Sequence, residues 1–148
     1  MAEVKYESKI TKSIAQPENI FAVLSNMKCL NLVRDMIPQD KVSDIEIDKE
    51  YVRFKVDGLG QKVCIRIVDT EPGKTVKYGI ENIPMEANMW IQLKQVADND
   101  TRLKVTIKAE LPAMFKMMLG SKLQDGVDRA AEMLAQMPFD NFSNLIEN

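Results

Sequence analysis

The side chains that most often do chemistry in proteins are scarce in this chain of 148 residues. It contains no histidine and only two cysteines, Cys29 and Cys64, which are far apart and form no C-x-x-C motif. Without histidine there is no usual general base near neutral pH and no Ser-His or Cys-His nucleophile. A zinc site or a disulfide framework needs more ligands or more cysteine pairs. Carboxylates, tyrosine and lysine remain as possible catalysts, but the sequence assigns no catalytic residue and no metal ligand.

The unusual chemistry of the chain is apolar and lies in "LPAMFKMMLGSKLQDGVDRAAEMLAQMP", residues 111–138. Apolar residues recur there at helical spacing, so a long helix is predicted over 112–137. Gly120 and Gly126 each cost about 1 kcal/mol relative to alanine inside a helix. Two reasons can justify them: a close approach of helix to sheet at Gly126, or a bend with local mobility at Gly120.

Methionines cluster around the first half of this predicted helix. Methionine is unbranched and adaptable, and it often lines surfaces that accept several shapes. These methionines are therefore candidates to line a deformable pocket: Met85, Met89, Met114, Met117 and Met118. The alternative is an ordinary core, which methionines at helical spacing form just as well.

The first part of the chain predicts one strand followed by one or two short helices. Alternation over residues 4–14 places one set of side chains on a common face: Val4, Tyr6, Ser8, Ile10, Lys12 and Ile14. In "QPENIFAVLSN", Pro17 suits a first helical turn and Glu18 suits the helix dipole. A break is expected near Ser25.

From about residue 42 to residue 110 the apolar period is two, which predicts about six strands. In "EPGK", residues 71–74, Pro72 presets φ and Gly73 accepts a positive φ, so a tight turn is expected. Another turn is expected at "DND", residues 98–100. Short connections favour an antiparallel meander with one apolar face, which the long helix covers. The predicted fold class is α+β.

The charge and the hydropathy of the chain limit the kinds of partner that we expect. The formal net charge is -2, and the basic residues are scattered singly along the chain, so we expect no nucleic-acid partner. No window approaches the ~18 apolar residues of a membrane span, so no stable membrane insertion is expected. The N-terminal "MAEVKYESK" does not resemble a secretory signal. A cytoplasmic protein with reduced thiols is the expectation.

The order of elements resembles the START-like, or helix-grip, superfamily (SRPBCC), which includes a polyketide cyclase/dehydrase-like bacterial branch. The resemblance rests on the opening strand before "QPENIFAVLSN", the turn in "DTEPGKTVKY", and "DNDTRLKVTIKAEL" before the long helix. It implies a curved antiparallel sheet of about seven strands gripping the C-terminal helix, with two short helices after the first strand. It also implies an apolar cavity between sheet and helix, and no cofactor. Residues 1–138 would form the single domain.

Carried onto this sequence, the resemblance implies a cavity for a small hydrophobic molecule, lipid-like or polyketide-like. The implied ligand-binding residues are Tyr6, Ser8, Phe54, Ile65, Tyr78, Met89, Val105, Phe115, Met118, Leu119 and Leu123. Tyr6, Ser8 and Tyr78 are the polar groups that could orient the ligand, although Tyr78 also suits a core position with its hydroxyl on a backbone carbonyl. The otherwise apolar set favours a binding or carrier protein over the alternative, a cyclase-like or isomerase-like enzyme.

Two further features leave a third function open, a protein-interaction domain. The tail, residues 139–148, has apolar residues at helical spacing and is predicted to form a short packed helix, either on its own chain or on a second subunit. Trp90 is predicted to face solvent, where it is either an isolated exposed aromatic or part of a homodimer contact.

Overall fold

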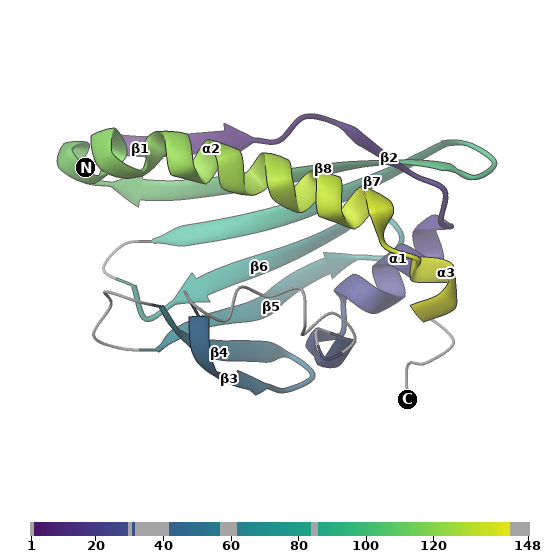
Figure 1. Cartoon of the computed structure of the whole chain (residues 1–148), viewed down its shortest axis with the longest axis horizontal. Helices are drawn as coiled ribbons and strands as arrows, with labels where there is room; N and C mark the ends of the chain where they lie inside the picture. The colour runs from purple at the N-terminus through teal and green to yellow at the C-terminus, as the bar shows by residue number, and fades with distance from the viewer. Residues whose placement is uncertain (1, 30, 32–41, 57–61, 84–85, 143–148) are drawn as a thin grey trace.

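The computed structural model describes residues 2–29, 31, 42–56, 62–83 and 86–142 (Figure 1). Within these ranges an antiparallel sheet curves around a long helix, and two shorter helices lie at one end. The strands are β1 (Ala2–Glu7), β2 (Thr11–Ser13), β3 (Val42–Ile47), β4 (Tyr51–Val56), β5 (Val63–Glu71), β6 (Thr75–Glu81), β7 (Ala87–Ala97) and β8 (Asp100–Leu111). The helices are α1 (Pro17–Leu24), α2 (Ala113–Gln136) and α3 (Phe139–Phe142).

Strands β3 to β8 form an antiparallel meander, and β1 pairs with the last strand, β8, at one edge of the sheet. Its order is β1-β8-β7-β6-β5-β4-β3, and β2 also pairs with β8. The turn predicted between β5 and β6 is confirmed, because Gly73 has φ 71° and the Lys74 amide donates to the Glu71 carbonyl at 2.9 Å. Asn99 takes a positive φ of 56° in the turn between β7 and β8. The α+β class and the curved sheet are therefore as predicted.

The first strand is not continuous, and this corrects the prediction of a single apolar face over residues 4–14. Glu7 pairs with Thr106 and Thr11 pairs with Leu103, so three residues, 8–10, lie opposite two, 104–105. Ser8 fills this bulge, since its hydroxyl accepts the Val105 amide at 2.9 Å.

The bulge reverses which side chains face the helix. Thr11 and Ser13 of β2 point inward, and the Thr11 hydroxyl donates to the Ala131 carbonyl of α2 at 2.9 Å. Ile10 and Ile14, predicted to lie inside, are 65% and 73% exposed on the outer face together with Lys12. Alternation alone could not show this, because isoleucine fits either face of a strand.

Short helical elements follow β2, as expected. α1 begins with Pro17 in its first turn and ends before Ser25, where the break was predicted. Residues 27–29 and 31 then have 3₁₀ conformation. The predicted second helix extended to Val33, which lies outside the described residues.

The C-terminal part of α2 is fastened to the bulged strand. The Lys9 amide donates to the Asp128 carboxylate at 2.8 Å, and the Lys9 ammonium forms an ion pair with Glu132. α2 then ends, and α3 turns back onto α1 (Figure 1). Phe139 of α3 is fully buried in the core, so this part of the tail packs on its own chain. Leu145 and Ile146 lie outside the described residues.

Candidate ligand-binding site

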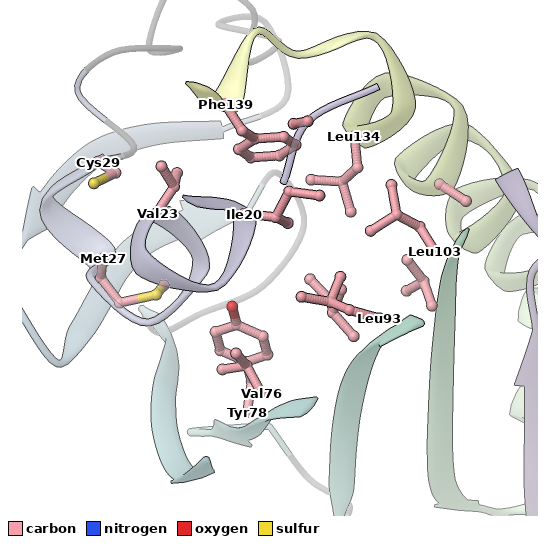
Figure 2. Packing of buried hydrophobic residues seen from close by; sticks show 14 of the residues in the cluster. Ile20, Val23, Met27, Cys29, Val76, Tyr78, Leu93, Leu103, Leu134 and Phe139 are labelled. Atoms are coloured by element: carbon pink, nitrogen blue, oxygen red, sulfur yellow. The ribbon is translucent and has the colours of Figure 1, made fainter. Parts of the chain in front are cut away.

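The interior is closely packed at the end of the sheet that α1 and α3 cover. Ile20 of α1 and Phe139 of α3 are fully buried, and Leu103 and Val105 of β8 are each 1% exposed. Figure 2 shows Ile20 of α1, Leu134 of α2 and Phe139 of α3 gathered over the strand residues Leu93 and Leu103. Deeply buried aliphatic side chains of this kind stabilise the fold and leave no room for a ligand.

The middle of the concave face is more open, between this packed core and a second buried cluster formed by Val4, Ala87, Ala109 and Leu111. The strand register aligns one row of side chains across five strands: Ile67, Tyr78, Met89, Ile107 and Tyr6. Of these, Ile67, Met89, Ile107 and Tyr6 are only half-buried, although most of them lie on central strands. An apolar surface on the concave face therefore remains accessible.

The N-terminal half of α2 lies over this accessible surface at one edge. A Cβ atom added to Gly120 would lie 3.1 Å from the Tyr6 hydroxyl oxygen, so the glycine permits a close approach of helix and strand. Gly126 has no atom within 4 Å of the corresponding position and is exposed. The predicted close approach at Gly126 is therefore wrong, because Gly126 lies on the solvent side of the helix.

Tyr78 is held by the protein itself. It is 3% exposed, and its hydroxyl donates to the Leu24 carbonyl at the end of α1 at 2.6 Å. Figure 2 shows the ring directed from β6 toward α1. Burial raises the pKa of Tyr78 above its usual range, because the phenolate would be poorly solvated. This geometry matches the core alternative for Tyr78.

Ser8 is also engaged in the sheet. Its hydroxyl accepts from the Val105 amide, as described above, and donates to the Lys9 carbonyl at 2.8 Å. Among the described residues the Tyr6 hydroxyl has no hydrogen-bond partner, so Tyr6 is the polar group with spare bonding capacity.

The structure brings part of the predicted set together. Half-buried side chains on the concave face come from Tyr6, Phe54, Ile65 and Met89, and Leu123 of α2 packs near Tyr6. Val105 belongs instead to the closely packed core. Phe115, Met118 and Leu119 lie in α2, but their side chains are outside what the structure describes.

The methionine prediction is partly wrong. Met114 and Met117 are 69% and 87% exposed, because their helical positions turn them away from the face that carries Leu123 and Val127. Met89 does lie on the concave face, and Met85 is outside the described residues.

Two concave-face residues, Ile67 and Ile107, were not among the predicted site residues. Both had a visible signal, because Ile67 continues the period-two run of Val63 and Ile65, and Ile107 continues that of Leu103 and Val105. The register, which the sequence does not reveal, places them beside Tyr78 and Met89.

A separate groove of about 990 Å³ lies beside the β7–β8 hairpin, near the start of α1. Residues of the β5–β6 turn and of the β7–β8 hairpin line it, with Ile10 and Pro17. None of the predicted ligand-binding residues lines this groove, so it is distinct from the concave face.

The two cysteines and the carboxylates are the side chains to consider as metal or cofactor ligands. Cys29 and Cys64 are unpaired and buried, and burial raises the pKa of the Cys29 thiol. Within the described ranges no three His, Cys, Asp or Glu residues form a group that could hold a metal ion. The described helices include none long and apolar enough to cross a membrane.

This architecture, a curved antiparallel sheet gripping a long C-terminal helix, is the helix-grip fold. Norcoclaurine synthase from Thalictrum flavum, solved with dopamine and hydroxybenzaldehyde, superposes with a TM-score of 0.68 at 13% identity, covering 97% of this chain and 86% of that one. Ara h 8.0201 gives a TM-score of 0.57 at 17% identity, covering 97% of each chain. A START superfamily protein from Mycobacterium smegmatis gives 0.57 at 14% identity, covering 90% and 97%. No family model and no curated protein matches the chain.

Proposed function

We propose that the chain binds a small, largely apolar molecule on the concave face, between the sheet and the N-terminal half of α2. The observation that carries the proposal is the row of half-buried side chains at the centre of the sheet, Ile67, Met89 and Ile107. Apolar side chains on central strands under a covering helix are normally buried completely. Leu103 and Val105, on the same strand as Ile107, are buried in this way.

The chemistry of the wall suggests the class of ligand. Of the described strand residues on the concave face, the ionisable ones are Tyr6 and Tyr78, and the Tyr78 hydroxyl is already bonded to Leu24. An uncharged apolar molecule with one hydrogen-bonding group suits this wall, with Tyr6 as the partner for that group. Phe115, Met118 and Leu119 of α2 remain proposed parts of the wall.

The structural neighbours are compatible with this proposal. Norcoclaurine synthase has the same fold and was solved with two small aromatic molecules, dopamine and hydroxybenzaldehyde. Its name also denotes an enzyme, but a cyclase-like or isomerase-like reaction here needs an acid or base at the ligand. The concave face as described supplies tyrosine hydroxyls for that role, so our proposal is binding or carriage without a reaction.

Binding is tested first by native mass spectrometry of the purified protein, followed by denaturing extraction of any released compound. We expect an apolar compound at near one-to-one stoichiometry, and extraction decides between lipid-like and polyketide-like ligands. Added 1-anilinonaphthalene-8-sulfonate (ANS) provides a second readout, because its fluorescence rises in apolar sites.

Matched tryptophan variants on one strand locate the site. Met89→Trp fills the concave face, whereas Asn88→Trp places the same side chain on the outer face of β7, outside the groove at the hairpin. We expect Met89→Trp to abolish ANS binding and Asn88→Trp to leave it unchanged, with both variants folded by circular dichroism. A protein without co-purified compound that also binds no ANS, or equal binding by the two variants, would refute the proposal.

A further inference from the structure

The outer face of the sheet carries exposed aliphatic side chains at one end. Ile10 and Ile14 are turned outward by the bulge at Ser8, and Val96 of the β7–β8 hairpin is 51% exposed. Ile10 and Val96 line the same groove at the hairpin. Side chains this exposed forgo the stabilisation of burial, and a cluster of them marks an interaction surface.

The same face gathers basic residues that are scattered in the sequence. Lys12, Arg102 and Lys94 lie directly opposite one another on β2, β8 and β7. Like charges in such a row destabilise a sheet, and here Asp100 offsets part of the repulsion by pairing with Arg102 and lying 4.0 Å from Lys12. We call the following set the basic strip, on the outer face of β1, β2, β6, β7 and β8: Lys5, Lys12, Lys77, Lys94, Arg102, Lys104 and Lys108.

Carboxylates balance only part of the basic strip. Glu7 pairs with Lys5 at 2.7 Å and with Lys104 at 3.7 Å, and Asp100 accepts two hydrogen bonds from Arg102 and lies 4.0 Å from the Lys12 ammonium. Among the described residues, the strip lysines without a carboxylate in ion-pair distance are Lys77, Lys94 and Lys108. The β5 side of the basic strip is bordered by Asp69 and Glu71. Four cations and one carboxylate line the groove at the hairpin, and two of the cations, Arg102 and Lys104, are paired with Asp100 and Glu7. Lys74 and Lys94 outnumber Glu71, so the groove keeps a small positive excess although the whole chain has a net charge of -2.

Trp90 lies inside the basic strip. The ammonium groups of Lys77 and Lys108 lie 5.2 Å and 5.8 Å from the centre of its ring, and the side chain is partly exposed. Tryptophan with flanking lysines is typical of protein surfaces at the boundary between lipid headgroups and acyl chains.

We propose that the basic strip, with Ile10, Ile14 and Val96 at its end, docks on the surface of a membrane that contains anionic lipids. The lysines contact the headgroups, and the aliphatic side chains enter the boundary with the acyl chains. A nucleic acid would use the cations and Trp90, but it would leave the exposed isoleucines without a partner. This proposal does not depend on a ligand at the concave face.

The test is flotation of the purified protein with phosphatidylcholine vesicles, with and without phosphatidylserine. We expect binding only to the anionic vesicles, and weaker binding as salt is raised. Lys94→Gln and Lys108→Gln should each lower the partition coefficient about fivefold. Ile14→Ser should lower it about tenfold, because the isoleucine no longer enters the acyl boundary.

Lys116→Gln and Lys122→Gln are the matched controls, because both lysines are exposed on α2 rather than on the outer face of the sheet. They change the net charge equally and should bind like the wild type. Equal binding to both kinds of vesicle, no binding to either, or an equal effect of control and strip variants would overturn the proposal. Tighter binding to a single-stranded oligonucleotide, lost in the strip variants, would overturn it in favour of a nucleic acid. ANS binding at the concave face is measured separately, so the two proposals succeed or fail independently.

Discussion

The two glycines of α2 form a matched pair that tests how helix and sheet meet. Alanine at Gly126 meets no atom within 4 Å, so Gly126→Ala should stabilise the protein by about 1 kcal/mol through helix propensity alone. For a domain of this size, that gain corresponds to an increase in Tm of about 2–4 °C. Alanine at Gly120 should gain the same propensity, but its Cβ would lie 3.1 Å from the Tyr6 hydroxyl oxygen. Overpacking of this kind costs about 1–3 kcal/mol, so Gly120→Ala should be neutral or destabilising.

A double-mutant cycle isolates the contact. Tyr6→Phe removes the hydroxyl oxygen, and the nearest remaining ring atom, Cζ, is 4.0 Å from the added Cβ, an ordinary contact distance. In the Tyr6→Phe background, Gly120→Ala should therefore stabilise the protein about as much as Gly126→Ala does. Urea unfolding followed by circular dichroism gives each free energy of unfolding from the midpoint and the slope. If Gly120→Ala stabilises the wild type as much as Gly126→Ala does, the close approach of α2 to Tyr6 is refuted.

Two further predictions concern the core. Tyr78→Phe leaves the Leu24 carbonyl without its donor and should cost about 1–3 kcal/mol in urea unfolding at neutral pH. Burial raises the pKa of Tyr78 in the folded state, so the protein loses stability as pH rises above the unfolded pKa of about 10, where only the unfolded chain gives up the phenolic proton. Tyr78→Phe should therefore weaken the loss of stability at alkaline pH. An unchanged pH profile of stability would contradict this. Leu103→Ala, in the closely packed core, should lower the free energy of unfolding by about 2–5 kcal/mol. Ile107→Ala, four residues further along the same face of β8, should lower it clearly less, because Ile107 is only half-buried. Equal losses would argue against an open concave face.

The strands of the sheet could be predicted because one face is buried and the other is exposed, which gives an apolar period of two along each strand. The strands from β3 to β8 and the turn at Gly73 follow from alternation and from the φ preferences of Pro72 and Gly73. The bulge at Ser8 was not predictable, because a serine that replaces a ladder contact with its own hydroxyl has the same sequence pattern as an ordinary strand residue. That single extra residue moved Ile10 and Ile14 to the outer face.

For the candidate site, the sequence predicted which face of the sheet a side chain lies on but not how deeply it is buried. Alternation placed Ile65 and Met89 on the concave side, but the degree of burial depends on where α1, α2 and α3 cover the sheet. Those positions arise from contacts distant in sequence, such as Lys9 with Asp128. The same limit applies to the basic strip, because only the register shows that Lys12, Arg102 and Lys94 are neighbours.

The interior is divided into closely packed clusters and a more open band, and this division separates two kinds of selection. Residues that hold the fold together, such as Phe139 and Ile20, lie in the core covered by α1 and α3. Met89 and Ile107 are only half-buried, so we expect substitutions there to alter the shape of the concave face at a smaller loss of stability. A chain built this way can change what it holds over evolutionary time, or in the laboratory, while the packed core maintains its folding.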